Sequence, residues 1–369
     1  MKTSTERILT THTGSLPRPA GLDRHDQTAI RAAVEETVRR QLDAGVDIVN
    51  DGEVSKPGYS TYVTERLSGF GGEPVSMQLR GFEEFPEFAQ KTWGDPEMAA
   101  IMANPSCNGP VAYVDRSLVD ADIASLRAAG SGATEVFMSA ASPGVIEMFM
   151  ANRYYGSTDD YLSALAEAMK LEYDVIYQAG LVVQLDCPDL ACEWAIGPEM
   201  TKAEFRRVVA KRLEALDYAT RDIPPDRLRI HLCWGNYEGP HHTDIPLADI
   251  IDLVLAARPM AVSFEGANPR HEHEWKVFEE VKLPEGKVLI PGVIDSTTNY
   301  IEHPELVAQR IMRYADVAGR ENVIAGSDCG FATFAAFVPV DPRITWAKLA
   351  ALAEGARLAS QELWKTAAA

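Results

Sequence analysis

The sequence predicts a (β/α)₈ TIM barrel with an insertion between its second and third strands. Three observations lead to this fold class. Short apolar runs of strand length occur eight times, helical patterns separate most of them, and the 369 residues suffice for one large barrel. Strands that alternate with helices favour a parallel sheet, and eight such units favour a closed barrel. An open doubly wound sheet is the alternative, but no G-x-G-x-x-G motif follows the first strand.

The expected elements follow from the spacing of apolar residues. The predicted strands begin near residues 8, 46, 134, 181, 228, 260, 287 and 322. The predicted helices cover 26–44, 158–179, 202–219, 246–257, 271–281, 304–318 and 344–364. Residues 54–133 are rich in Gly, Pro and Phe, and we expect them to be an insertion packed over one end of the barrel, with an extra strand at 111–114. Residues 1–369 are expected to form a single catalytic domain.

Composition narrows the class of function. The chain is 46% hydrophobic and 24% charged, as globular proteins are, and its net charge of −19 disfavours nucleic acid and anionic membranes as partners. The start of the chain is polar, and no apolar run has membrane-spanning length. Five scattered cysteines without an export signal are typical of reduced thiols, so a cytoplasmic location is expected.

Polar or reactive side chains follow nearly every predicted strand. In (β/α)₈ barrels the catalytic residues lie at the carboxyl ends of the strands, so these side chains are expected to meet at one face. In chain order they are His12, Gly14 and Ser15; Asp51 and Glu53; Asp186 and Cys187; His231 and Cys233; Glu265; Asp295; and Asp328 and Cys329.

Four of these residues predict a zinc site: His231, Cys233, Glu265 and Cys329. Imidazole and thiolate suit zinc, and a carboxylate can complete the shell. Zinc deprotonates a bound thiol, and the thiolate rather than the thiol is the nucleophile. The set therefore favours alkylation of a substrate thiol, with Glu265 as the exchangeable ligand, over hydrolysis. A structural zinc without alkyl transfer is the alternative, because four protein ligands are typical of structural sites.

Seven short stretches carry a resemblance to a known family. They are Thr11–Pro17, Asn50–Glu53, Gln184–Asp186 before Pro188, His231–Cys233, Glu265, Pro291–Asp295 and Gly326–Gly330. Together they resemble the catalytic C-terminal barrel of cobalamin-independent methionine synthase and its single-barrel relatives, which include epoxyalkane:coenzyme M transferases.

The resemblance implies roles for individual residues. It implies that His231, Cys233, Glu265 and Cys329 hold zinc. It implies that Gly14, Ser15, Glu53 and Asp186 bind the acceptor homocysteine, with the two acids on its ammonium group and Ser15 on its carboxylate. Asp186 and Asp295 are the catalytic candidates.

Two departures from the synthase pattern bear on the alkyl donor. The synthase has a histidine two residues after the aspartate of its Gly-Val-x-Asp motif, where this chain has Thr297. Asp186-Cys187-Pro188-Asp189 stands in place of the synthase's Asp-Glu-Pro-Ala. Methyl transfer to a homocysteine-like thiol from a folate or a corrinoid, the latter carried by a partner protein, is the first expectation. Epoxide ring opening by a thiol such as coenzyme M is the alternative.

Other residues are candidates for the second substrate. Arg18 and Arg270 are candidate anchors for an anionic group, and residues 237–243 and 270–275 are candidate lid segments with histidines that titrate near neutrality.

Overall fold

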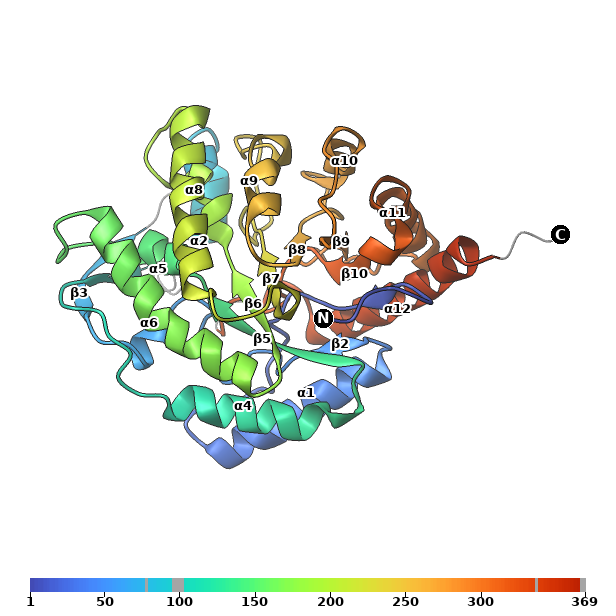
Figure 1. Cartoon of the computed structure of the whole chain (residues 1–369), viewed down its shortest axis with the longest axis horizontal. Coiled ribbons are helices and arrows are strands. Elements are labelled where there is room, and N and C mark those ends of the chain that lie inside the picture. The colour runs from blue at the N-terminus through green and yellow to red at the C-terminus, as the bar shows by residue number, and fades with distance from the viewer. Residues whose placement is uncertain (77–78, 95–102, 336–337, 366–369) are drawn as a thin grey trace.

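Eight parallel strands form a nearly closed ring in the computed structural model, which describes residues 1–76, 79–94, 103–335 and 338–365 (Figure 1). The strands of the ring are β1 (Leu9–Thr10), β2 (Ile48–Val49), β5 (Glu135–Ala141), β6 (Val182–Asp186), β7 (Leu228–His231), β8 (Ala261–Phe264), β9 (Val288–Ile294) and β10 (Ile324–Ser327). Their order is β1-β10-β9-β8-β7-β6-β5-β2, and every pair is parallel.

The ring closes between β1 and β2. The backbone N–H of Asp47 donates to the carbonyl of Thr10 at 3.2 Å, and the Thr11 hydroxyl donates to the carbonyl of Ile48 at 3.0 Å. These contacts complete the barrel, so the predicted (β/α)₈ fold is confirmed.

Helices cover the outside of the ring (Figure 1). They are α1 (Gln27–Asp43), α4 (Ser117–Ala129), α5 (Pro143–Phe149), α6 (Thr158–Gln178), α7 (Glu193–Ile196), α8 (Lys202–Ala219), α9 (Ile251–Ala256), α10 (Val277–Glu280), α11 (Pro304–Ala318) and α12 (Pro342–Leu363). Side-chain caps define where the long ones begin. Ser157 accepts from the N–H of Asp160 at the start of α6, and Thr201 and Glu204 form a reciprocal capping box on α8.

Two predicted helices are shorter than expected. The segment 246–257 begins as a 3₁₀ turn at Leu247–Asp249 before α9, and 271–281 begins as a 3₁₀ turn at Glu272–Lys276 before α10. Within the described part of the chain, no helix combines the length and the apolar character needed to cross a membrane.

A buried arginine lies among the apolar side chains inside the ring. Leu9, Ile48, Phe137, Val182, Val288 and Ile324 belong to one cluster made of residues from the strands. The guanidinium of Arg229 stacks 3.9 Å from the centre of the Phe137 ring and donates to the carbonyl of His12 at 2.7 Å. Burial lowers the pKa of Arg229 to about 9. Arg229 precedes His231 by two residues on β7, so its charge lies close to the end of the barrel where the site is expected.

The predicted insertion follows β2. It contains a two-stranded antiparallel sheet of β3 (Phe70–Ser76) and β4 (Ala103–Cys107), and a helix α2 (Pro86–Trp93). Residues 77–78 and 95–102 of this segment lie outside the described residues, and its bounds at 54 and 133 stay a prediction.

The extra strand predicted at 111–114 is wrong. Tyr113 forms only an isolated bridge with Leu67. The pairing with 66–68 is limited to the backbone hydrogen bonds from Ser68 to Ala112 and from Val114 to Arg66, and Pro110 has no N–H with which to continue a ladder.

A buried ion pair joins the segment after β2 to the outer helices. The Arg66 guanidinium binds the Glu172 carboxylate of α6 through two hydrogen bonds of 3.0 Å, and the Tyr113 hydroxyl donates to the same carboxylate at 2.8 Å. Both charged side chains are at most 4% exposed. Removing one partner would leave the other charge buried without compensation.

We expect Arg66→Met to lower the free energy of unfolding by about 3–5 kcal/mol, the usual effect of breaking a buried pair on one side. The double variant Arg66→Met, Glu172→Leu should recover much of that loss, because no charge is then left unpaired. Urea denaturation followed by circular dichroism measures both. Equal losses in the single and the double variant would contradict the expectation.

Candidate metal and substrate site

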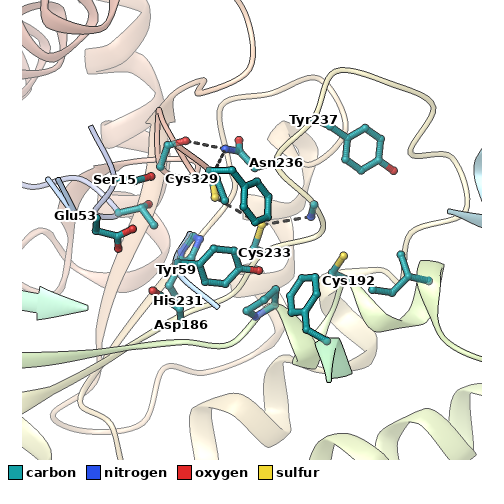
Figure 2. Close-up of a pocket in the computed structure, with 18 of the residues that line it drawn as sticks. Ser15, Glu53, Tyr59, Asp186, Cys192, His231, Cys233, Asn236, Tyr237 and Cys329 are labelled. Atoms are coloured by element: carbon teal, nitrogen blue, oxygen red, sulfur yellow. Dashed lines mark hydrogen bonds between the residues drawn. The ribbon is translucent and has the colours of Figure 1, made fainter. Parts of the chain in front are cut away.

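Three ligand-type side chains converge at the carboxyl end of the barrel. His231 is the last residue of β7, Cys233 follows two residues later, and Cys329 lies two residues after β10. All three are buried, and one ligand atom from each lies within 4.8 Å of the others. The sulfur atoms of Cys233 and Cys329 are 3.6 Å apart (Figure 2).

Asp328 fixes the start of the Cys329 segment against the turn after β8. One oxygen of its carboxylate accepts from the backbone N–H groups of Gly266 and Ala267, and the other accepts from the N–H and side-chain amide of Asn268, all at 2.8 Å. The turn after β8 is thereby bound to the end of β10.

The donors present fit a zinc ion. Nδ1 of His231 lies 3.2 Å from the Ser263 hydroxyl. When Nδ1 carries the proton and donates it to that hydroxyl, Nε2 has a free lone pair. This buried Nε2 has no hydrogen-bond partner. Burial lowers the pKa of His231 to about 3, so the imidazole is neutral. Two sulfurs bound to a tetrahedral zinc at about 2.3 Å lie roughly 3.8 Å apart, close to the separation of Cys233 and Cys329.

Glu265 lies outside this three-residue group. Its Oε1 accepts from the backbone N–H of Trp234 at 2.9 Å, and its Oε2 accepts from the side chains of Asn268, at 2.7 Å, and Arg270. Burial raises the pKa of Glu265, but the charges of Arg270 and His271, the Trp234 N–H and the charge of His241 together lower it by more, so the carboxylate is ionised. Its role as a fourth metal ligand stays a prediction.

A cavity of about 950 Å³, part of it open to solvent, adjoins the three ligands. Ser15, Glu53 and Asp186 line it together with His231, Cys233 and Cys329. In the view of Figure 2, Ser15 and Glu53 lie on one side of the two sulfurs, and Cys192 and Tyr237 lie on the other. The remaining wall is largely apolar and includes Tyr59, Leu79, Phe149, Pro188, Ile196 and Phe334.

The loops after β1 and β10 meet beside Ser15. The backbone N–H of Phe331 donates to the Ser15 carbonyl at 2.8 Å. A Cβ atom at position 330 would lie 2.0 Å from the Ser15 hydroxyl, so this approach requires glycine at Gly330. The contact places Ser15 directly beside the end of the Cys329 segment.

Glu53 is held in an unusual backbone conformation. Its φ of +57° lies in the left-handed region, which is uncommon for residues other than glycine. Its N–H donates to the Asp51 carboxylate at 2.9 Å, and Gly14 packs over its carboxylate, where a Cβ would lie 2.9 Å from Oε1. Oε1 accepts from the Ser139 hydroxyl, whereas Oε2 is buried and has no hydrogen-bond partner.

Asp186 completes the acidic side of the cavity. Its Oδ1 accepts from the side-chain amide of Gln184 at 2.8 Å. Burial, followed by the charge of Glu53, raises the pKa of Asp186 to about 8. In the absence of a cation this carboxyl group therefore stays largely protonated at neutral pH.

Asp295 is not among the described residues that line this cavity. Its carboxylate accepts four hydrogen bonds, from the backbone and hydroxyl groups of Thr297 and Thr298. Its catalytic role stays a prediction.

The two candidate anion anchors are engaged within the protein. Arg18 donates to the carbonyls of Glu53, Lys56 and Ala332 and ties three loops together. Arg270 binds Glu265, Asn268 and the Gly235 carbonyl.

The predicted lid segments form a buried network beside the cavity. Tyr237 lines the cavity and stacks on His241 with 4.0 Å between ring centres. His241 and His271 both contact the Asp244 carboxylate, at 2.8 and 3.3 Å, and His271 also contacts Glu274 at 2.7 Å. Burial alone lowers the pKa of His271, but these two carboxylates raise it to about 10, so the ring carries a positive charge at neutral pH.

Comparison with known proteins supports the same family as the motifs. The chain is 25% identical over 374 residues to a protein named methionine synthase from Saccharolobus solfataricus, and the match covers 96% of each chain. A B12-independent methionine synthase from Shewanella sp. W3-18-1, solved in complex with selenomethionine, has a TM-score of 0.76 at 19% identity and covers 98% of this chain and 100% of its own. The predicted resemblance to the cobalamin-independent methionine synthases is confirmed.

Further relatives agree with this synthase-like barrel. A protein named methionine synthase from Thermococcus kodakarensis is 22% identical over 91% of this chain and 84% of its own. A putative vitamin-B12-independent methionine synthase structure from Listeria monocytogenes has a TM-score of 0.64 at 16% identity, covering 98% of this chain and all of the other. No protein-family model matches the sequence.

The site also contains residues that the sequence did not single out. Lys56 and Ser139 lie behind Glu53, and Tyr59 and Phe334 form part of the cavity wall. Lys56 follows Glu53 by three residues, so its nearness to that strand end was visible in the sequence. Tyr59 and Phe334 carried no such signal, because their places depend on how two distant loops pack.

We expect the stability contributed by His271 to depend on pH. The folded pKa lies above the ordinary value of 6.5, so the contribution is complete below about pH 6.5 and is lost as pH rises toward 10. The difference in unfolding free energy between the wild type and His271→Gln should shrink by up to about 1.4 kcal/mol per pH unit across that window.

Urea denaturation between pH 6 and 10 measures this difference. His242→Gln is the matched control, because His242 forms an exposed ion pair with Glu84 and its substitution should show no such trend. A difference for His271→Gln that stays constant with pH would contradict the assignment.

Proposed function

We propose that this chain is a zinc-dependent thiol alkyltransferase and that its first reaction is methyl transfer to homocysteine. The observation that carries the proposal is the convergence of His231, Cys233 and Cys329 in a cavity that also contains Glu53 and Asp186. The names of the full-length relatives support methyl transfer to a thiol. In this proposal residues 1–369 act as one catalytic domain, and Glu265 is the exchangeable fourth ligand.

A zinc ion held by His231, Cys233 and Cys329 would supply the positive charge that keeps an acceptor thiol deprotonated at neutral pH. The residues around it orient the acceptor. Oε2 of Glu53, which is buried and unpartnered, accepts one N–H of the acceptor's ammonium group, and Asp186 accepts another. Ser15 and the backbone beside it bind the acceptor's carboxylate.

The apolar wall of the cavity performs a second task. Tyr59, Phe149 and Phe334 line the space next to the two sulfurs and exclude water from it. A nucleophilic sulfur is more reactive when its hydration shell is reduced, and the reacting alkyl group needs an apolar surface on which to lie. We assign proton handling during donor activation to Asp295, whose neighbour Thr297 stands in place of the synthase histidine.

Epoxide ring opening by coenzyme M is the second candidate, and Thr297 is the observation that favours it. A hydroxyl near the donor lacks the acid–base capacity of imidazole at neutral pH. The two candidates differ in the acceptor, since coenzyme M has no ammonium group for Glu53 and Asp186 to bind.

We expect the purified wild type to carry about one zinc per chain, the stoichiometry of a single tetrahedral site. Cys329→Ser should lose that zinc and alkyl transfer while keeping its circular dichroism spectrum, because the barrel has its own core. Cys192→Ser is the matched control, since Cys192 lines the same cavity outside the three-residue group and should retain zinc. Unfolding of both Cys329→Ser and chelator-treated wild type would instead support a structural zinc, and wild type without zinc would refute both candidates.

The reaction itself is tested with a matrix of acceptors and donors. Homocysteine and coenzyme M are each offered methyltetrahydrofolate, methylcobalamin and epoxypropane, and products are identified by mass spectrometry. We expect S-methylation of homocysteine, and we expect Glu53→Gln to raise its KM about tenfold or more through loss of a charge-assisted hydrogen bond. Turnover of coenzyme M with epoxypropane and none of homocysteine would favour the second candidate.

A further inference from the structure

We infer that Lys56, acting through Ser139, is the residue that positions Glu53 so that a single carboxylate oxygen faces the acceptor. This makes Lys56 a determinant of specificity for thiols that carry one ammonium group. The inference rests on the proposed function, because it concerns how that acceptor is selected.

The contacts behind Glu53 form a short chain. The Lys56 ammonium group donates to the Ser139 hydroxyl at 2.9 Å and to the Ser139 carbonyl at 2.8 Å. The same hydroxyl donates its own hydrogen to Oε1 of Glu53, and the Lys56 nitrogen lies 3.8 Å from that oxygen. Oε1 is thereby bound to the protein through the Ser139 hydroxyl, and the charge of Lys56 lies beside the same oxygen.

The other oxygen of Glu53 is left for a ligand. Oε2 is buried and has no hydrogen-bond partner, and Glu53 as a whole is 2% exposed. A buried carboxylate oxygen without a donor is costly to maintain, which indicates that a ligand supplies the donor. An ammonium group of the acceptor has the required N–H and the required charge.

Lys56 does not itself bind an anion from the acceptor. Its side chain is 7% exposed, it is not among the described residues that line the cavity, and its hydrogen bonds go to Ser139. Arg18 fixes the segment around it by donating to the carbonyls of Glu53, at 3.0 Å, and Lys56, at 2.8 Å.

Charge at this corner of the cavity favours one added cation. Glu53 and Asp186 line the cavity, and Lys56 is the cation behind them. Burial alone lowers the pKa of Lys56, but the carboxylates of Glu53, Asp51, Asp186 and Asp122 raise it to a value above the ordinary 10.5, so the group stays charged. A cationic group of the ligand therefore meets Glu53 and Asp186, with no lysine or arginine among the described residues that line the cavity.

The test compares two thiols that differ only by the amino group. Homocysteine and 4-mercaptobutanoate share the thiol and carboxylate, and only the first can bind Glu53 through an ammonium group. We expect Lys56→Met, as the zinc-loaded full chain, to raise KM for homocysteine about tenfold, the effect of losing roughly 1.4 kcal/mol. KM for 4-mercaptobutanoate should change less than about twofold, a loss well under that amount, and kcat for both thiols should stay near that of the wild type.

Two further variants keep the inference testable if Lys56→Met folds poorly. Ser139→Ala keeps the charge and removes the hydroxyl between Lys56 and Glu53, so it should reproduce the selective rise in KM. In a double-mutant cycle the effects of Lys56→Met and Ser139→Ala should be less than additive, because both act through Oε1 of Glu53. Arg66→Met, which breaks a comparably buried ion pair away from the cavity, is the matched control and should leave the ratio of the two KM values unchanged.

The outcomes separate this inference from the proposed function. Equal rises in KM for both thiols, or no rise for homocysteine, would overturn the role of Lys56 while leaving thiol alkylation intact. Absence of turnover for either thiol with the wild type would mean that the proposed function itself has failed.

Discussion

The Asp328 carboxylate joins the ends of two strands on which the geometry of the site depends. Through four hydrogen bonds it fixes the turn at 266–268, which follows β8, against the first residue after β10. Cys329 is the next residue, and its position relative to Cys233 follows from this clamp. The carboxylate is buried without a cation among its hydrogen-bond partners, and burial together with nearby Asp295 and Glu265 raises its pKa to about 7. Three backbone amides and the Asn268 side chain, rather than a counter-ion, therefore hold the group that organises the site.

Buried cations recur behind the acidic strand ends. Arg229 lies beneath the site inside the ring, Lys56 lies behind Glu53, and Arg270 lies against Glu265. Each is bound to the protein, so none is an unengaged anchor for an anion. In a chain of net charge −19, these buried cations offset part of the carboxylate charge in and around the cavity. Only the part of the carboxylate charge that these internal pairs leave uncompensated is available to a ligand.

Much of the barrel was predictable, because eight apolar runs and the helices between them are local patterns. The convergence of His231, Cys233 and Cys329 was also predictable, since strand ends of a parallel barrel meet at one face. The pairing of β3 with β4 was not, because Phe70–Ser76 and Ala103–Cys107 are rich in Gly, Pro, Asn and Ser and contain Val75 as their one β-branched residue. The partners of Glu265 and Glu53 were equally out of reach, since they depend on how loops far apart in the chain pack together.

The left-handed backbone at Glu53 separates what the fold needs from what the cavity needs. A glycine would adopt that conformation without strain, so the chain's path through residue 53 gives no reason for a side chain there. Glutamate at this position therefore destabilises the fold relative to glycine, and its role in the cavity explains why it is present. Sequence drift under selection for stability alone would be expected to remove it, which makes the residue at this position a marker of whether a related barrel still binds an amine-bearing ligand.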